Sequence, residues 1–399
     1  MAYDLSLKLV DHDNLSRLKW EYEVYRTDYK DMICMGTADM DFMSPNPILQ
    51  AIHHVADRGH LGYPMIPDAY YEAIHDWLMR KTSWDIDTMQ SVCHNQGIYI
   101  SGWSILDVLT KPGDKIVILS PVHFCFKRMI DMNQRVTIEC PLVQVDGHYT
   151  IDENALEACL ASGAKLLWIC NPHNPVGRAW SRAELQLIAD LCVKYDVQIL
   201  SDDVYCGLIF PGTEYVPIAS LSKEVSYRTV TLYSTSKSYN TTGLLHSYIV
   251  TENPETMKRY IESMDRLDLR YSVDIMGIYA LIAAYNECDE WLEKVQRQLQ
   301  KNHQIVASYF ANHIPDAPVA EANATYFAWI DMRKLGMNPR QLGYAIEQEE
   351  HIILENGLRG GKGGGGFVRL NVATSEENIL EAMERLNRFW KRHKNGGKR

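Results

Sequence analysis

The sequence predicts an α/β fold in which helices cover a mostly parallel sheet, with a smaller α+β domain beside it. Short, nearly continuous apolar runs alternate with stretches of helical periodicity between about residues 90 and 250. Parallel strands are buried on both faces and therefore read as continuous apolar runs. The 399 residues, 46% of them hydrophobic and 23% charged, suit a large globular chain of this kind.

The composition argues against several classes of protein. The net charge of −11 is unfavourable for nucleic-acid binding. The nine cysteines are scattered without a C-x-x-C pair, which predicts reduced thiols in a cytoplasmic protein and no metal site. The N-terminus has no apolar core of a signal peptide. The longest apolar run, Ile275 to Tyr285, is too short for the ~20 residues of a membrane span, so we expect no membrane association.

The first third of the chain predicts an arm followed by helices. Residues 1–34 mix charged and aromatic residues without a period. Pro45 and Pro47 predict a helix that starts near Pro47, because proline is favoured in the first helical turn. Apolar residues at helical spacing predict a second helix over residues 68–81.

The central part predicts the alternation of strands and helices. A helix is expected to open at the stretch 97–102 and to stop before Pro112. Ser181 and Glu184 have the spacing of a capping box at the start of another helix. Strands are predicted over residues 115–119, 136–139, 166–170, 197–200, 229–233 and 248–250.

The last part predicts a different arrangement. A long helical stretch is expected over about residues 255–303, bent near Arg270 and bridging two domains. Strands are predicted over 326–330 and 367–371, and a closing helix over 375–392. We therefore expect an N-terminal arm and part of the small domain over 1–50, a large domain over 51–285 and the rest of the small domain over 286–399.

A lysine follows the strand predicted over residues 229–233. Lys237 comes after Ser234 and Ser236, at a strand's carboxyl end, where open α/β sheets bind ligands. Its amine can form a Schiff base with a carbonyl, and the hydroxyls can hold a phosphate. Alone this signal is weak, because most lysines in such loops are only solvated.

Three other stretches supply what a pyridoxal phosphate site needs. Asp202 can pair with a protonated pyridine nitrogen, and Asn174 and Tyr205 can donate to a phenolic oxygen. The amides of Ile98 and Tyr99 at a predicted helix start suit a phosphate. Taken singly, each of these residues is explained as well by a place at a helix start or in a turn as by cofactor binding. Their joint placement at strand and helix ends favours a cofactor site.

These stretches resemble a known family. Asn171-Pro172-His173-Asn174-Pro175-Val176-Gly177, Ser201-Asp202-Asp203-Val204-Tyr205, Ser234-Thr235-Ser236-Lys237 and Arg369 are similar to motifs of the fold-type I pyridoxal phosphate enzymes of the class I/II aminotransferase superfamily. Ala38 to Phe42, Gly62-Tyr63, Lys111 to Asp114 and Ala219 to Ser222 resemble its MalY/PatB branch, the cystathionine β-lyase-like C–S lyases.

The resemblance implies roles for the cofactor site. Lys237 would hold pyridoxal 5'-phosphate covalently and then act as the general base for the Cα proton. Asp202 would pair with the pyridine nitrogen, and Asn174 and Tyr205 would bind the phenolic oxygen. The phosphate ligands would be Ser234, Ser236 and the amides of Ile98 and Tyr99.

The resemblance also implies substrate and subunit contacts. Arg369 would bind the α-carboxylate of a small amino-acid substrate, and Ala38 would contact that substrate. Tyr63 would reach the phosphate of a neighbouring subunit, which implies a homodimer. The sequence departs from the branch at His123, where a tyrosine usually stacks on the cofactor; an imidazole can stack and can exchange protons near neutral pH. Leu245 stands near the place of a phosphate-binding arginine.

The resemblance implies a C–S β-lyase that converts a cysteine S-conjugate or cystathionine-like amino acid to pyruvate, ammonia and a thiol. An aminotransferase acting on an L-amino acid and an α-keto acid, and a regulatory or interaction protein that keeps the cofactor, are the alternatives. A second carboxylate-binding residue would favour an aminotransferase for dicarboxylic substrates, and the sequence offers no candidate. The glycine-rich stretch 360–366 does not match a P-loop and is predicted to be a mobile loop, a candidate lid over the site.

Overall fold

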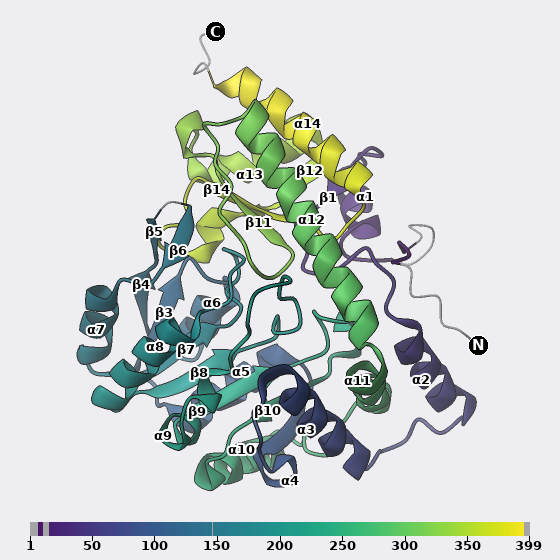
Figure 1. The fold of residues 1–399 in the computed structure, drawn as a ribbon, viewed down its shortest axis with the longest axis vertical. Coiled ribbons are helices and arrows are strands. Elements are labelled where there is room, and N and C mark those ends of the chain that lie inside the picture. The colour runs from purple at the N-terminus through teal and green to yellow at the C-terminus, as the bar shows by residue number, and fades with distance from the viewer. Residues whose placement is uncertain (1–6, 11–15, 146, 395–399) are drawn as a thin grey trace.

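A computed structural model describes residues 7–10, 16–145 and 147–394 of the chain. A large sheet with helices on both faces forms one part, and a smaller sheet beneath the C-terminal helices forms the other (Figure 1). The predicted α/β fold with a mostly parallel sheet is confirmed.

Seven strands of the described residues make the large sheet. All run parallel except β10, which is antiparallel to both of its neighbours. Asp202 on β8 pairs with Leu232 on β9, so these two strands end at the same edge and bring their following residues together. The order across the sheet is β2 (Val92–Asn95), β10 (Ser247–Val250), β9 (Thr229–Tyr233), β8 (Gln198–Asp202), β7 (Ala164–Cys170), β3 (Lys115–Ser120) and β4 (Val136–Pro141).

Alternate residues of the strands pack against different helices. Ile116 and Ile118 of β3 lie in one core, and Val117 and Leu119 lie in the other. The first core packs against α5 (Ile98–Leu109), α6 (Cys125–Met132) and α10 (Pro254–Arg266), and the second against α7 (Glu153–Ala161), α8 (Arg182–Lys194) and α9 (Lys223–Tyr227). The predicted capping box at Ser181 and Glu184 begins α8.

A second group of helices packs near the antiparallel side of this sheet. The two helices predicted in the first third are present as α2 (Asn46–Asp57) and α3 (Asp68–Thr82). Both pack on α11 (Ile275–Glu287), whose apolar side chains are largely buried. The short helices α1 (Glu21–Thr27) and α4 (Thr88–Ser91) complete this half of the chain.

The prediction of one long bent helix over 255–303 is wrong. The segment forms three helices: α10, α11 and α12 (Asp289–His313). The first break falls where expected, because Asp268 adopts a left-handed conformation (φ 55°) and the Asp274 side chain caps the start of α11. The second break, at Cys288, was not predicted. The helix that runs from the large sheet to the smaller one is α12 (Figure 1).

The smaller sheet is antiparallel, in the order β11 (Phe327–Asp331), β14 (Phe367–Asn371) and β13 (Glu355–Asn356). The helices α12, α13 (Pro339–Glu350) and α14 (Glu376–His393) lie in the same part of the molecule as this sheet (Figure 1). The N-terminal segment joins this part, because β1 (Ile33–Cys34) pairs with β12 (Ile352–Ile353). The domain limits 1–50, 51–285 and 286–399 stay predictions.

The remaining elements are the hairpin β5 (Val143–Val145) and β6 (His148–Thr150) and the 3₁₀ turns η1 (Ile218–Ser220), η2 (Thr242–Leu244), η3 (Arg333–Leu335) and η4 (Gly357–Gly360).

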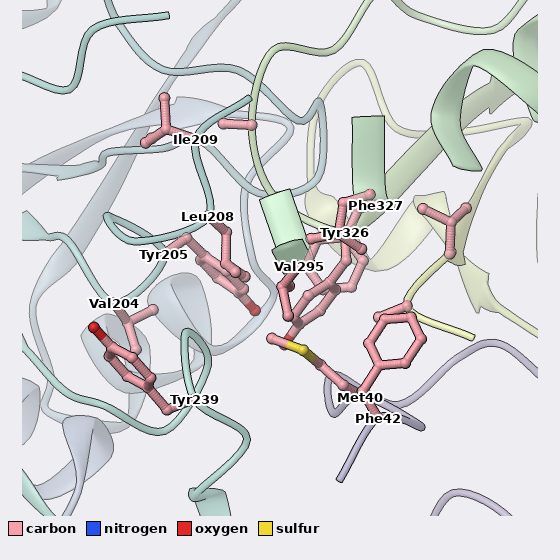
Figure 2. Packing of buried hydrophobic residues seen from close by; sticks show 14 of the residues in the cluster. Met40, Phe42, Val204, Tyr205, Leu208, Ile209, Tyr239, Val295, Tyr326 and Phe327 are labelled. Carbon is pink, nitrogen blue, oxygen red and sulfur yellow. The ribbon is translucent and has the colours of Figure 1, made fainter. Parts of the chain in front are cut away.

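Buried side chains from distant parts of the chain meet between the two sheets. Figure 2 shows Met40 and Phe42 of the N-terminal segment near Tyr326 and Phe327. The Tyr205 ring lies 5.6 Å, centroid to centroid, from the rings of both Tyr326 and Phe327. The loop after β8 is thus packed against residues 326 and 327, in the same cluster as the N-terminal segment.

The described residues contain neither a membrane span nor a metal cluster. No helix among them is long and apolar enough to cross a membrane. No group of three or more His, Cys, Asp or Glu side chains within the described ranges is placed to hold a metal ion. All nine cysteines fall in these ranges and are free thiols.

Candidate active site

A pocket that opens to solvent at its mouth lies at the carboxyl edge of the large sheet. Most of the site residues predicted from the sequence line it: Ala38, Ile98, Tyr99, His123, Asn174, Asp202, Tyr205, Ser234, Ser236 and Lys237. Arg369 and Tyr63 do not.

Lys237 follows β9 and points its amine at the N-terminal segment. Nζ donates hydrogen bonds to the carbonyl oxygen of Ala38 at 2.9 Å and to Oγ1 of Thr242 at 3.4 Å. Burial lowers the pKa of Lys237 to about 8, although the nearby Asp39 acts to raise it. Far more of this amine is therefore unprotonated near neutral pH than in an ordinary lysine, as a nucleophile or general base requires.

Asp202 is the last residue of β8 and is almost fully buried. It accepts a hydrogen bond from the amide of Val204 at 3.3 Å. Burial raises the pKa of Asp202 to about 7, and Lys237 lowers it only in part. A cation placed against this carboxylate would restore its ionised form, which is what a protonated pyridine nitrogen offers.

Asn174 connects the pocket to Arg369. It lies buried in the turn after β7, and its Oδ1 accepts a hydrogen bond from Nη1 of Arg369 at 2.9 Å. The neighbouring His173 holds this turn in place, with Nε2 at 2.8 Å from the carbonyl oxygen of Pro121. The amide nitrogen of Asn174 and the hydroxyl of Tyr205 are the donors available for an acceptor in the pocket.

The first turn of α5 presents free amides at the pocket. Its N-cap, Gly97, has a φ of 88° and provides no side-chain cap, so the first N–H groups are left to a ligand. Ser234 is less free than predicted, since its Oγ donates to the carbonyl oxygen of His246 at 2.6 Å and accepts from the amide of Ser236 at 3.0 Å. Leu245 lines the pocket in a left-handed conformation and brings no charge.

His123 lies parallel to Tyr99, with ring centroids 6.3 Å apart and an angle of 19° between the rings. Burial lowers the pKa of His123 to about 3, and the cationic Arg369 and Lys237 act in the same direction. The ring is therefore neutral near pH 7. It can stack, but the expectation that it exchanges protons near neutral pH is wrong.

Arg369 lies in a smaller adjoining pocket that shares His123 and Asn174 with the first. Its Nη2 donates to the carbonyl oxygen of Gly36 at 2.9 Å, and its guanidinium carbon lies 3.9 Å from the centroid of the Phe327 ring. These contacts fix the side chain, yet Nε is buried without a hydrogen-bond partner. A fixed, buried guanidinium with an unused donor is suited to an anionic group.

Two sequence predictions have a different place in the structure. Tyr63 is 87% exposed and lies outside both pockets, so its proposed contact requires another subunit and stays a prediction. The glycine-rich stretch packs closely on the site: Gly360 accepts a hydrogen bond from the amide of Val122 at 2.9 Å, and a Cβ on Gly364 would clash with the carbonyl oxygen of Gly357. Close packing gives these glycines a structural role, and opening as a lid stays a prediction.

The comparisons with known proteins identify the family. Residues 30–386 match the family described as aminotransferase class I and II. The chain belongs to this family. It is 30% identical to cystathionine beta-lyase PatB of Bacillus subtilis over 92% of this chain and 95% of that protein. It is 28% identical to protein MalY of Escherichia coli over 96% of this chain and 97% of that protein.

Solved structures of similar chains agree with this family. Cystalysin from Treponema denticola, which contains a pyridoxal 5'-phosphate cofactor, is 31% identical and superposes with a TM-score of 0.92 over 98% of this chain and 99% of cystalysin. A pyridoxal phosphate-bound C–S lyase from Staphylococcus hominis is 25% identical, with a TM-score of 0.88 over 97% and 98% of the two chains. The resemblance seen in the motifs is thus confirmed at the level of family and fold.

The pocket residues of this family member fit pyridoxal phosphate. The pocket combines a buried amine, a buried carboxyl that needs a cation, and uncapped amides that suit a phosphate.

Sequence reasoning missed several residues that lie close to the predicted site residues. Thr242, beside Lys237, had no motif to mark it. Glu355 and Arg359, which line the smaller pocket, stand just before the glycine-rich stretch, which was interpreted only as a loop.

Proposed function

We propose that this chain is a pyridoxal phosphate-dependent C–S β-lyase that converts a cysteine S-conjugate or cystathionine-like amino acid to pyruvate, ammonia and a thiol. One observation carries the proposal. Lys237, Asp202 and the Arg369-bound Asn174 converge on one pocket, in a chain that resembles cystathionine β-lyases over almost its whole length.

Each pocket residue is assigned to the part of the cofactor that its chemistry suits. Lys237 binds the cofactor through its amine, and Asp202 pairs with the ring nitrogen. Asn174 and Tyr205 donate to the phenolic oxygen, and the first amides of α5 bind the phosphate with Ser234 and Ser236. His123, neutral and parallel to Tyr99, lies against the ring. When bound, pyridoxal phosphate supplies a protonated ring that takes up the electron pair left on the substrate's Cα.

The proposed substrate contacts orient the bond that breaks. Arg369 binds the α-carboxylate, and Ala38 lies beside the amine of Lys237 where the substrate's amino end would lie. Once the substrate's amino group has taken its place on the cofactor, the freed amine of Lys237 would accept the proton from Cα. The bond between Cβ and sulfur then breaks and its electron pair leaves with the thiolate. Hydrolysis of the remaining three-carbon unit gives pyruvate and ammonia.

A second candidate is an aminotransferase, because the family includes that activity in its description. Both reactions begin with removal of the Cα proton, so the same residues serve either one. The two reactions differ in their later steps: a lyase releases a thiol and needs no α-keto acid, whereas an aminotransferase consumes one for every amino acid converted.

The proposed working form is a cytoplasmic homodimer in which Tyr63 contacts the partner's phosphate. The exposed positions of Leu61, Tyr63 and Met65 and the free cysteines support it. Mixing Lys237→Ala chains with Tyr63→Phe chains tests it. If Tyr63 acts across subunits, hybrid dimers contain one intact site and regain activity. If mixing restores nothing, Tyr63 has no such role.

The experiment that tests the function uses purified protein supplied with pyridoxal phosphate. With L-cystathionine, the lyase produces pyruvate and free thiol in equal amounts, and Lys237→Ala produces neither. Thiol release without pyruvate, or pyruvate formation that survives in Lys237→Ala, contradicts the proposal. Asn240→Ala cannot serve as a control because its side chain holds the N-terminal segment. Lys258→Ala, on the outer face of α10, is a suitable one.

A further inference from the structure

The smaller pocket contains a charged pair that the proposed chemistry does not use. Arg359 and Glu355 line it together with Phe124 and Arg369. His123 and Asn174 belong to both pockets, so the smaller one continues directly from the site of the reaction. A substrate whose α-carboxylate is bound by Arg369 can extend toward this pair.

Arg359 is held at the mouth of this pocket. Its guanidinium carbon lies 3.8 Å from the centroid of the Phe124 ring, and its Nη1 donates to Oε1 of Glu355 at 3.0 Å. The Arg359 side chain remains 54% exposed, so it has donors that face solvent and can reach a ligand. Stacking on Phe124 orients the planar guanidinium and lowers the entropy lost when it binds.

Glu355 lies between the two arginines. It faces Arg369 across the β13–β14 pair and accepts the hydrogen bond from Arg359, and its side chain is only 19% exposed. These three residues carry two positive charges and one negative charge. An α-carboxylate on Arg369 balances the excess positive charge, which leaves the Arg359–Glu355 pair neutral as a unit.

This balance selects among the groups that a substrate can carry at its far end. An alkyl group gains no polar contact from the pair. A lone carboxylate meets Arg359 but also faces Glu355, so attraction and repulsion oppose each other. A zwitterionic amino-acid end matches both charges, with its carboxylate on Arg359 and its ammonium on Glu355.

We propose that Arg359 and Glu355 form a second recognition site for the far end of substrates in which sulfur links two amino acids. The leaving thiol is then itself an amino acid, as in a thioether-linked or disulfide-linked diamino acid. This inference rests on the proposed lyase function and names the substrate class that the enzyme prefers. The site distinguishes these compounds from simple S-alkyl cysteines.

The test compares two substrates that share the reacting end. The values of kcat/KM are measured for L-cystathionine and for S-ethyl-L-cysteine with the wild type, Arg359→Gln and Glu355→Gln. We expect either substitution to lower kcat/KM for L-cystathionine about 10-fold, because a charge-assisted hydrogen bond is lost. For S-ethyl-L-cysteine the change in Arg359→Gln should stay within about 2-fold, because Arg359 is exposed and its ion pair contributes little by itself. Glu355→Gln also alters the surroundings of Arg369, so for this variant the expectation is a larger loss with L-cystathionine than with S-ethyl-L-cysteine.

Lys362→Gln is the matched control, since Lys362 is exposed in the same segment and lines neither pocket. It removes one positive charge and should affect both substrates equally. If Arg359→Gln changes both substrates by the same factor, or changes neither, the pair is only a surface ion pair and the inference is overturned. The same holds if Lys362→Gln reproduces the selective loss.

A separate readout distinguishes failure of this site from failure of the lyase. If the wild type makes pyruvate from neither compound, the proposed function is wrong, and the dissociation constants of both compounds are then measured by calorimetry. A selective weakening of L-cystathionine binding in Arg359→Gln still supports the recognition site. Equal binding of that compound by the wild type and the variant overturns it.

Discussion

Nη1 of Arg369 donates a hydrogen bond to Oδ1 of Asn174 over 2.9 Å, although 195 positions separate the two residues. Arg369 lies on β14 of the smaller sheet, and Asn174 lies in the turn after β7 of the large sheet. The residue proposed to bind the substrate is thus positioned by a residue proposed to bind the cofactor. The fold couples the two sites through this contact.

Arg369→Lys should weaken substrate binding much more than cofactor binding. Lysine cannot make the forked contact of a guanidinium, and a lost charge-assisted hydrogen bond corresponds to a rise in KM of about 10- to 100-fold. Steady-state kinetics with L-cystathionine measure the rise, and the absorbance of bound cofactor serves as the check. Arg333→Lys, at an exposed arginine of η3, is the control. An unchanged KM in Arg369→Lys would show that Arg369 does not bind the α-carboxylate of the substrate.

Asp202→Asn should stabilise the cofactor-free protein at and above neutral pH and should strongly lower activity. The pKa of Asp202 is about 7 in the fold, against an ordinary value of 3.8. The unfolded chain therefore releases this proton first, and the native state loses stability as pH rises from about 4 to about 7. Asparagine does not titrate, so the melting temperature of the variant relative to wild type should increase between about pH 4 and about pH 7.

Activity of Asp202→Asn should fall at least about 100-fold, since the pyridine nitrogen loses its partner. The melting temperatures are measured by calorimetry on protein freed of cofactor, with Asp190→Asn on α8 as an exposed control. A constant difference in melting temperature across this pH range would show that Asp202 is not a buried, uncompensated acid.

Binding of pyridoxal phosphate to the cofactor-free protein should become faster as pH rises through about 8. The unprotonated amine of Lys237 attacks an aldehyde carbon, and burial has lowered the pKa of Lys237 to about 8. Stopped-flow absorbance at several pH values measures the rate. A rate that rises only above about pH 10 would mean that the amine keeps its ordinary pKa.

Gly364→Ala should destabilise the wall of the site. A Cβ at Gly364 clashes with the carbonyl oxygen of Gly357, whereas a Cβ at Gly365 lies 3.8 Å from its nearest neighbour. Overpacking of this kind costs about 1–3 kcal/mol. Urea unfolding of both variants measures the difference, and Gly365→Ala should match the wild type. Equal stabilities would favour the predicted mobile loop over the packed wall.

Local signals in the sequence were sufficient for most of the fold. Continuous apolar runs predicted the central strands, and the spacing of Ser181 and Glu184 predicted the start of α8. The break at Cys288 escaped prediction because apolar periodicity continues across it and no proline or glycine marks it. α11 packs on α2 and α3, whereas α12 runs toward the smaller sheet, so the break separates two packing environments.

The site residues that stand in recognisable motifs could be predicted from the sequence. Those that come together only through pairing and packing in the fold could not. Lys237, Asp202 and Asn174 stand at strand ends, so their meeting could be inferred from the order of the elements. The partners Arg359 and Glu355 become neighbours of His123 only through the pairing of β13 with β14. The neutrality of His123 depends on burial, which no single sequence reveals.

The most direct test of the lyase assignment counts turnovers in the absence of any α-keto acid. Purified holoenzyme receives L-cystathionine in large excess, and pyruvate is followed continuously with a coupled reduction to lactate. A C–S β-lyase forms many equivalents of pyruvate per subunit at a steady rate, and adding an α-keto acid leaves that rate unchanged. Absence of pyruvate, together with bleaching of the bound cofactor after one equivalent of L-cystathionine per subunit and recovery of its absorbance on addition of an α-keto acid, would identify an aminotransferase and contradict the lyase.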